Sequence, residues 1–103
     1  MKKISNKQKK IKKELSKVYI ELMNERPHYC TGCGRSGVPL SHSHLIPRSR
    51  RSDLVTEKKN ITYHCLSMGE RKGCHDIWES KDRYRLLDYH KNMEYILEVD
   101  TEY

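Results

Sequence analysis

Four cysteines are spaced so that a single metal ion could bind them all. They are Cys30, Cys33, Cys65 and Cys74. The first two form a Cys-x-x-Cys pair among glycines, and two thiolates at that spacing can hold the same ion. Eight residues separate the second pair, and two glycines in this insert allow it to loop out. Because cysteines in a reducing compartment are more often metal ligands than disulfides, we predict a structural Zn²⁺ site.

Two alternatives to a four-cysteine site stay open from the sequence. The cysteines could pair as disulfides, or one thiolate could be replaced by a histidine beside a cysteine, either His64 or His75. If the first cysteine pair closes onto the second, the intervening chain becomes a hairpin.

This hairpin would gather polar side chains suited to acid–base and metal chemistry. His42 and His44 share one face of the first expected strand, because strand side chains alternate. Asn60 begins the returning strand, and His75 follows Cys74 at the start of a helix. The sequence therefore predicts three histidines and an asparagine within one small ββα unit.

Residues 30–79 resemble the HNH endonucleases of the ββα-metal (His-Me finger) superfamily, especially the small zinc-stapled phage and bacterial members. The resemblance covers roughly half of the chain and rests on short motifs in the family's order. These motifs are Cys-x-x-Cys, His44-Leu45-Ile46-Pro47-Arg48-Ser49, Asn60-Ile61, Cys65 and Cys74-His75. The three residues that name the family fall on His44, Asn60 and His75.

The resemblance implies a metal-dependent endonuclease or nickase that hydrolyses DNA phosphodiester bonds. It assigns His44 as the general base that takes a proton from water, and His75 as a ligand of a catalytic cation, Mg²⁺ or another divalent ion. Asn60 would hold the strands together and orient the region around His44. The catalytic cation would be separate from the zinc, because four thiolates fill a tetrahedral shell.

The sequence departs from the family pattern immediately before His44. Many members have Asp or His there as a second metal ligand, whereas this chain has Ser43, which is a poor one. Three replacements stay open, namely His42, water, and Glu79 one helical turn after His75.

Basic side chains dominate the first three quarters of the chain. Residues 1–26 carry a formal charge of +6, residues 27–75 carry +5, and residues 76–103 carry −4. This distribution predicts a polyanionic partner, which we expect to be DNA bound mainly through its backbone. The expected phosphate contacts lie between the strands and are Arg48, Arg50, Arg51, Lys58 and Lys59.

Two other functions fit the same residues. A noncatalytic zinc-binding module could bind nucleic acid or a partner protein, the nuclease site having decayed at Ser43. An RNA-directed nuclease would differ from the first hypothesis only in its substrate. Further candidate partners are a second copy of the chain, joined through the first helix as a homodimer, and a phage protein.

The expected architecture is a single α+β domain with a small zinc-stapled ββα-metal (HNH) core between two helical segments. Residues 1–26 form a basic amphipathic helix that begins at a Ser-x-x-Gln capping box at Ser5 and stops at Pro27. Residues 27–79 form the zinc-bound core, and residues 80–103 form a C-terminal helix.

Two short strands are expected within the core, over residues 38–46 and 60–66, because glycines and prolines interrupt any helical pattern there. Aromatic and aliphatic residues that follow are spaced as the buried face of a helix. We therefore expect core positions at Trp78, Tyr84, Leu87 and Met93.

Composition limits what this chain can be. It has 103 residues with 35% hydrophobic residues, no Phe and one Trp, and its mean hydropathy is −0.96. The length excludes a multidomain enzyme, a large barrel or a dinucleotide-binding fold. Because so few apolar residues form only a small hydrophobic core, we expect a bound metal ion to stabilise the fold. The sequence has neither a membrane-spanning stretch nor a signal-peptide core, so we expect no membrane partner and a cytoplasmic location in a bacterial or phage-infected cell.

Overall fold

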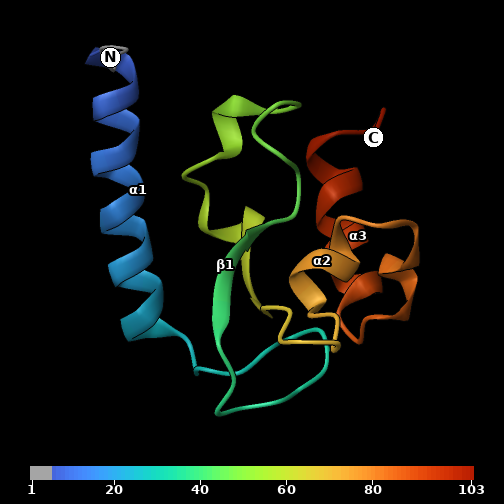
Figure 1. Ribbon diagram of the computed structural model, residues 1–103. Helices are drawn as coiled ribbons and strands as arrows, with labels where there is room; N and C mark the ends of the chain where they lie inside the picture. The colour runs from blue at the N-terminus through green and yellow to red at the C-terminus, as the bar shows by residue number, and fades with distance from the viewer. Residues whose placement is uncertain (1–5) are drawn as a thin grey trace.

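A two-stranded antiparallel sheet lies at the centre of the domain in the computed structural model, which describes residues 6–103 (Figure 1). Strand β1 is Leu40–His44 and strand β2 is Ile61–Cys65, each slightly shorter than the sequence predicts. Within the described residues, three α-helices accompany this sheet. The predicted α+β class is therefore confirmed.

The N-terminal helix α1, Asn6–Glu25, runs beside the sheet and stops before Pro27, as expected from the missing amide hydrogen of proline (Figure 1). Leu22 is fully buried against the domain, and the Arg26 guanidinium donates to two backbone carbonyls around the start of β2. The capping box predicted at Ser5 lies outside the described residues. In the described part of the chain, no helix has both the length and the apolar character needed to cross a membrane.

The register of the sheet decides which side chains share a face. Because paired residues point the same way and neighbours alternate, His42 and His44 lie on one face, with Ser41 and Ser43 on the other. The ring of Tyr19 in α1 stacks on the ring of His42 with their centroids 4.0 Å apart. The face that carries the two histidines is therefore the face toward α1.

Polar β1 is held in place at both of its ends. All five residues of β2 are buried, which suits its β-branched and aromatic side chains, whereas β1 contains only one aliphatic residue. Backbone pairing continues past the strands, since the Leu45 N–H donates to the Asn60 carbonyl at 2.8 Å and the Leu66 N–H donates to the Pro39 carbonyl at 2.9 Å. These contacts extend a sheet that has little apolar surface of its own.

The C-terminal quarter is not the one continuous helix that we expected over residues 80–103. Helix α2 is Cys74–Trp78, a 3₁₀ turn covers Lys81–Arg85, and helix α3 is Tyr89–Val99. The chain breaks before α3 because Leu86 enters the core and the Leu87 N–H bonds to the Gly32 carbonyl at 2.9 Å. A long-range contact therefore competes successfully with local helix formation.

The core lies between the sheet, α2 and α3. Trp78 is 1% exposed, as predicted, and its indole N–H donates to the Leu45 carbonyl at 3.1 Å. Met93 packs against this core, whereas Tyr84 and Leu87 are exposed, so those two predicted core positions are wrong. The prediction assumed one continuous helix, but the helix is broken at these two residues, so their side chains do not face the core.

Gly73 is the glycine that the fold depends on most. A Cβ atom there would lie 2.3 Å from the Leu66 carbonyl carbon and 2.4 Å from the Cys65 carbonyl oxygen, both of which belong to backbone. We expect Gly73→Ala to lower the free energy of unfolding by about 3 kcal/mol, because α2 would have to move away from β2.

Gly37→Ala is the matched control for this substitution. Its φ is +71°, but nothing lies within 4 Å of the added Cβ, so backbone strain of about 1 kcal/mol is the only expected cost. Urea unfolding of the zinc-loaded variants measures both values. A Gly73→Ala protein that is as stable as Gly37→Ala would contradict the packing of α2 against the end of β2.

Candidate functional site

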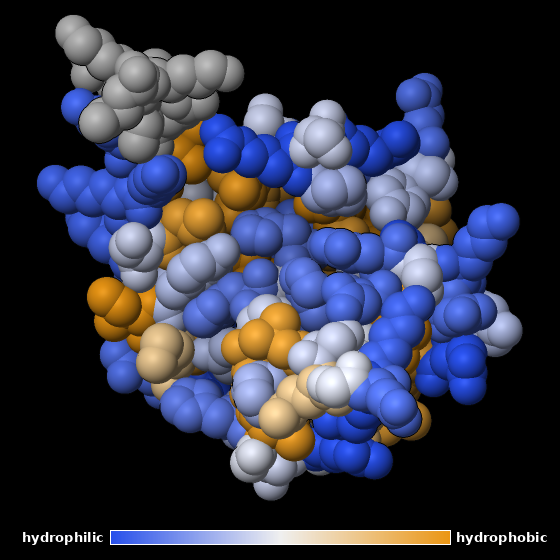
Figure 2. Space-filling model, in the orientation of Figure 1, coloured by the Kyte–Doolittle hydropathy of each residue, from blue (hydrophilic) through white to orange (hydrophobic). Residues whose placement is uncertain are grey.

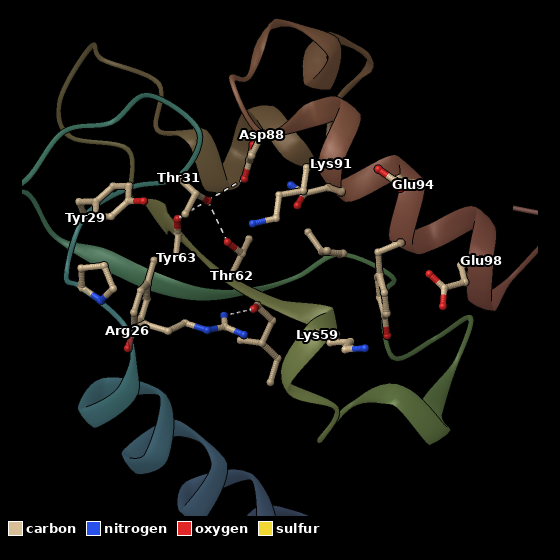
Figure 3. A pocket seen from close by; sticks show the side chains of 15 residues that line it. Arg26, Tyr29, Thr31, Lys59, Thr62, Tyr63, Asp88, Lys91, Glu94 and Glu98 are labelled. Carbon is tan, nitrogen blue, oxygen red and sulfur yellow. Dashed lines mark hydrogen bonds between the residues drawn. The ribbon is translucent and has the colours of Figure 1, made fainter.

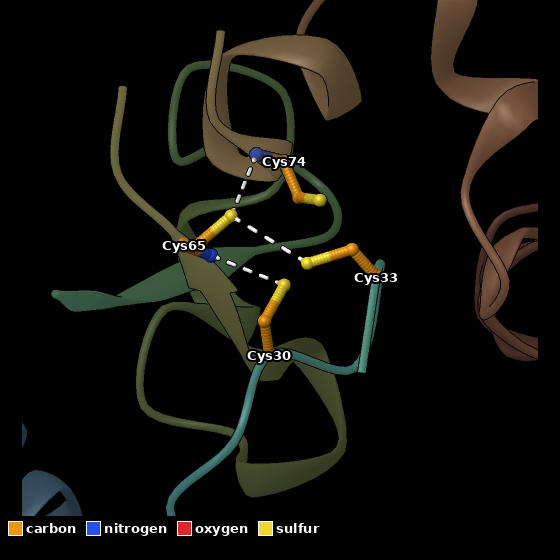
Figure 4. A group of neighbouring side chains, drawn as sticks. All are labelled: Cys30, Cys33, Cys65 and Cys74. Atoms are coloured by element: carbon orange, nitrogen blue, oxygen red, sulfur yellow. Dashed lines mark hydrogen bonds between the residues drawn. The ribbon is translucent and has the colours of Figure 1, made fainter. Parts of the chain in front are cut away.

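The four cysteines lie together, as the sequence predicts (Figure 4). Their sulfurs are all within 4.8 Å of one another, and the Cys33 and Cys65 sulfurs are 3.9 Å apart. A tetrahedral zinc ion with Zn–S bonds of about 2.3 Å holds its sulfurs about 3.8 Å apart. All four are free thiols, so the donor set and spacing fit a zinc ion and do not support the disulfide alternative.

Three separate elements position these sulfurs. Cys30 and Cys33 lie in a tight turn, in which the Gly34 N–H donates to the Cys30 carbonyl at 2.7 Å and Gly34 adopts a φ of +79°. Cys65 is the last residue of β2, and Cys74 is the first residue of α2. The insert between Cys65 and Cys74 forms a turn of its own, so it loops out without separating the two ligands, as predicted.

Hydrogen-bond donors converge on the sulfurs. The Cys65 N–H donates to the Cys30 sulfur at 3.2 Å, and the Cys74 N–H donates to the Cys65 sulfur at 3.3 Å (Figure 4). The Arg71 guanidinium, which returns from the insert, donates to the Cys65 sulfur at 3.4 Å. Such donors stabilise thiolates and orient them, as the groups behind metal ligands generally do.

Without a cation, the thiols cannot all ionise together. Burial raises the pKa of both the Cys30 and the Cys74 thiols, and contact with Cys30 raises that of Cys74 further. Burial also opposes ionisation of Cys65, but the Cys74 N–H and the neighbouring thiols outweigh it and lower its pKa to about 7. A cluster that favours one thiolate and resists further charge needs a bound cation to ionise fully.

His44 lies at the end of β1 and is half-buried. Its Nε2 is 2.8 Å from the Val55 carbonyl oxygen. Because a carbonyl can only accept, Nε2 carries the hydrogen, and a neutral imidazole then has its lone pair on Nδ1. The ring is therefore oriented by backbone and keeps one nitrogen able to accept a proton.

Asn60 closes the loop between β1 and β2, which contains the Val55 carbonyl. It is fully buried, its Oδ1 accepts from the Ile46 N–H at 2.8 Å, and its Nδ2 donates to the carbonyls of Ile46 and Leu54 at 3.1 and 3.2 Å. Three hydrogen bonds from one side chain thus tie the two ends of the interstrand loop together. These are the contacts expected of a residue that orients the region around His44.

His75 belongs to a second group of potential metal ligands on α2. Its imidazole lies with the carboxylates of Asp76 and Glu79, all ligand atoms being within 4.8 Å of one another. The Ser41 hydroxyl donates to a backbone carbonyl and lies 3.0 Å from His75 Nδ1, so Nδ1–H donates to Ser41 and Nε2 keeps its lone pair. Nε2 lies 3.7 Å from the Glu79 carboxylate, and one nitrogen with two carboxylates suits a divalent cation.

The structure does not bring His42 to this group. His42 faces α1 on the opposite side of the sheet from Ser41, and burial, followed by the charges of His44 and Arg26, lowers its pKa. Of the replacements left open for the missing ligand, Glu79 is therefore the side chain that lies beside His75. Ser43 is 1% exposed and buried in the sheet.

His44 and His75 do not share a face of the sheet. His44 points to the α1 side, whereas His75 contacts Ser41 on the other side. Strand β1 pairs only with β2 in the described sheet, so its second edge carries no strand. His44 and His75 therefore lie on opposite faces of the sheet and contact opposite ends of β1.

Three of the five predicted phosphate contacts are already engaged within the chain. Arg50 pairs with Asp100 at 2.8 Å, Arg51 pairs with Asp53 at 2.8 Å, and Lys58 pairs with two glutamates of α1. Arg48 and Lys59 are exposed and make no ion pair within the described residues. Figure 2 shows one face of the domain, on which hydrophilic residues predominate and apolar residues appear between them.

A buried hydrogen-bond network escaped the sequence analysis. His64, which is fully buried, donates from Nε2 to the Asp88 carboxylate at 2.9 Å. The Thr31 hydroxyl donates to the same oxygen at 2.6 Å (Figure 3). Burial opposes ionisation of Asp88, but His64 and Thr31 outweigh it and lower the pKa of the carboxyl. No motif links residues 31, 64 and 88, so nothing in the spacing indicates their contact.

Comparisons of the chain with protein-family models, with curated proteins and with solved structures found no match. The candidate site has three parts. It consists of the four-cysteine cluster, His44 with the loop closed by Asn60, and His75 with its two neighbouring carboxylates.

We expect the purified protein to contain about one zinc ion per chain, and its removal by a chelator to abolish cooperative unfolding, because structural zinc can contribute on the order of 10 kcal/mol to a small domain. Cys74→Ser should lose the metal, as measured by native mass spectrometry and elemental analysis. Met68→Ser, which alters an exposed residue in the insert, should keep it. A metal-free protein with the same circular dichroism and unfolding curve would contradict a structural zinc site.

Proposed function

We propose that this chain is a metal-dependent HNH endonuclease or nickase that hydrolyses DNA phosphodiester bonds. The observation that carries the proposal is the setting of His44 at the end of β1. Its Nε2 is held by the Val55 carbonyl, within a loop that buried Asn60 closes. The cysteine cluster and His75 follow at the far end of the same hairpin.

His44 has the properties of a general base. Its Nδ1 would accept a proton from a water molecule as the water oxygen attacks phosphorus. The Val55 carbonyl fixes the ring and stabilises the resulting imidazolium through the Nε2–H bond. The new O–P bond forms as the bond from phosphorus to the 3′ oxygen breaks. The departing 3′ oxygen takes a proton from a solvent water molecule and His44 returns its proton to solvent, which leaves a 5′ phosphate and a 3′ hydroxyl.

The second metal of the proposal is a divalent cation, Mg²⁺ or another, which His75, Asp76 and Glu79 would hold. When bound, such a cation stabilises the negative charge that develops on the phosphate and on the departing oxygen. The Ser41 hydroxyl keeps His75 in the tautomer that a metal ligand requires. The four-cysteine site cannot take this role, because a complete thiolate shell leaves no open position.

Contacts to the DNA backbone would come from two basic surfaces. Arg48 and Lys59 lie beside the His44 loop, while Arg50, Arg51 and Lys58 would have to exchange their carboxylate partners for phosphates. The second surface is the exposed lysine face of α1, which consists of Lys9, Lys10, Lys12, Lys13 and Lys17. Binding of this kind is salt-sensitive, because phosphate contacts release counterions.

The burial of Ser43 favours a second candidate function, a noncatalytic module that binds nucleic acid. A serine that is 1% exposed offers little to a metal at the position where many family members have a ligand. This function predicts binding that weakens steeply between about 50 and 200 mM salt without strand breakage. Competition between duplex DNA, single strands and RNA distinguishes both functions from an RNA-directed nuclease.

We expect the zinc-loaded protein to nick supercoiled plasmid in Mg²⁺, Mn²⁺ or Ni²⁺. His44→Ala should slow nicking by about 10²- to 10⁴-fold, the usual contribution of a general base, with DNA binding retained. His90→Ala is the matched control, because His90 is an exposed histidine of α3. Intact plasmid in all three metals would count against the nuclease, and a fully active His44→Ala would remove the assigned base.

The substitution Glu79→Gln tests the proposed cation site. This change removes a carboxylate beside His75, so the Mn²⁺ concentration for half-maximal nicking should rise at least about tenfold, since even residues behind metal ligands commonly contribute that much. Glu70→Gln, which alters an exposed glutamate in the insert, should leave the concentration unchanged. Equal Mn²⁺ dependence of both variants would show that the cation binds elsewhere.

A further inference from the structure

Arg26 follows α1 directly and extends its guanidinium to the start of β2 (Figure 3). Its backbone is fixed, because the Arg26 N–H donates to the carbonyl of Leu22 at 2.9 Å and Leu22 is fully buried. Pro27 comes next and prevents the helix from continuing. The guanidinium is therefore presented from an anchored position at the end of α1.

The guanidinium joins two carbonyls that lie on either side of Asn60 in the chain. One of its terminal nitrogens donates to the Lys58 carbonyl at 2.8 Å, and the other donates to the Ile61 carbonyl. A planar guanidinium can reach two acceptors at once, and its charge strengthens both hydrogen bonds. One side chain thus fixes the backbone before and after Asn60.

A second contact holds the same turn against α1. The turn is the 3₁₀ helix Lys58–Asn60, and the Lys58 ammonium pairs with Glu21 at 2.7 Å and with Glu25 at 2.8 Å. Helix α1 and the residue that follows it therefore hold Lys58 by its side chain and by its carbonyl. Ion pairs at the surface contribute little, so the charged hydrogen bonds of the half-buried Arg26 are the stronger contact.

Asn60 connects this turn to the proposed general base. Its Nδ2 donates to the Leu54 carbonyl at 3.2 Å, and the carbonyl of the next residue, Val55, lies 2.8 Å from His44 Nε2. Asn60 and Val55 are both buried. A displacement of the turn would therefore move the carbonyl that orients the imidazole.

We propose that Arg26 is a positioning residue, which holds the turn of Asn60 and thereby the orientation of His44. The inference rests on the proposed nuclease function, in which His44 is the general base. Because two backbone carbonyls occupy its guanidinium, we assign Arg26 no phosphate. It connects the base to α1, the helix whose exposed lysines would contact DNA.

The test is single-turnover nicking of plasmid by an excess of zinc-loaded protein in saturating divalent metal. At saturating protein, the rate constant does not depend on what fraction of the protein is folded. We expect Arg26→Ala to lower this rate constant about 10- to 100-fold, since a misplacement of about 1 Å can cost 10²-fold. The protein concentration for half-maximal rate should stay unchanged. A rise in that concentration with an unchanged rate constant would indicate a phosphate contact or a loss of folded protein, and would overturn the proposal.

Two further variants control for charge and for folding. Arg35→Ala removes the same charge from an exposed position outside the turn of Asn60, and it should keep the parental rate constant. Arg26→Lys keeps the charge but loses the planar fork, so we expect it to lower the rate constant as well. If Arg26→Ala does not fold, Arg26→Lys decides the matter, and a parental rate constant in that variant would overturn the proposal.

Nuclear magnetic resonance tests the same connection without any nuclease activity. In the isotope-labelled, zinc-loaded parent at alkaline pH, the ring nitrogens of His44 should report one tautomer with its hydrogen on Nε2, as the Val55 carbonyl requires. Arg26→Ala and Arg26→Lys should give a mixture of tautomers and shift the Asn60 side-chain amide signals. Arg35→Ala should give the parental signals.

These readouts separate the proposal from the function on which it rests. A parent that leaves plasmid intact in every metal would contradict the nuclease, and the tautomer of His44 would still decide whether Arg26 orders the turn. A parent that nicks plasmid, with an Arg26→Ala variant of equal rate constant, would overturn this proposal alone. The parental tautomer in Arg26→Ala would overturn it whether or not the parent nicks DNA.

Discussion

The convergence of four sulfurs on one point is the constraint on which the rest of this domain depends. It joins the turn after α1, the end of β2 and the start of α2, which are three segments that lie apart in the sequence. The buried core of Trp78, Ile46 and Ile96 lies directly beside that cluster. In a chain with so few apolar residues, a metal ion held by these sulfurs would supply the stabilisation that a larger domain obtains from burial.

Asn60 is the second organising contact, and it acts through hydrogen bonds. Its side chain satisfies both polar groups of Ile46 and one of Leu54 within a fully buried position, where unpaired groups would be costly. Whereas the cysteine cluster fixes one end of the hairpin, Asn60 fixes the other. His44 lies next to this second clamp, so the proposed base is attached to rigid backbone.

Ion pairs within the domain reduce the positive charge that is available to a binding partner. Several basic side chains near the His44 loop already have carboxylate partners, including Asp100 from the acidic C-terminal segment. The C-terminal segment therefore does more than cover the core, because its Asp100 neutralises the charge of Arg50 in the interstrand loop. The exposed lysines of α1 keep their charge available, which makes that helix the stronger candidate for backbone contacts.

Local spacing in the sequence determined the Cys-x-x-Cys turn, both strands to within two residues, the end of α1 at Pro27 and the shared face of His42 and His44, because each depends on neighbours in the chain. Only the tertiary structure decided the break before α3, the separation of His75 from His42, and the burial of His64 against Asp88. Those features depend on contacts between segments 20 or more residues apart or on which face of the sheet a helix covers. Periodicity carries no information about such contacts, since it records only the geometry of a single element.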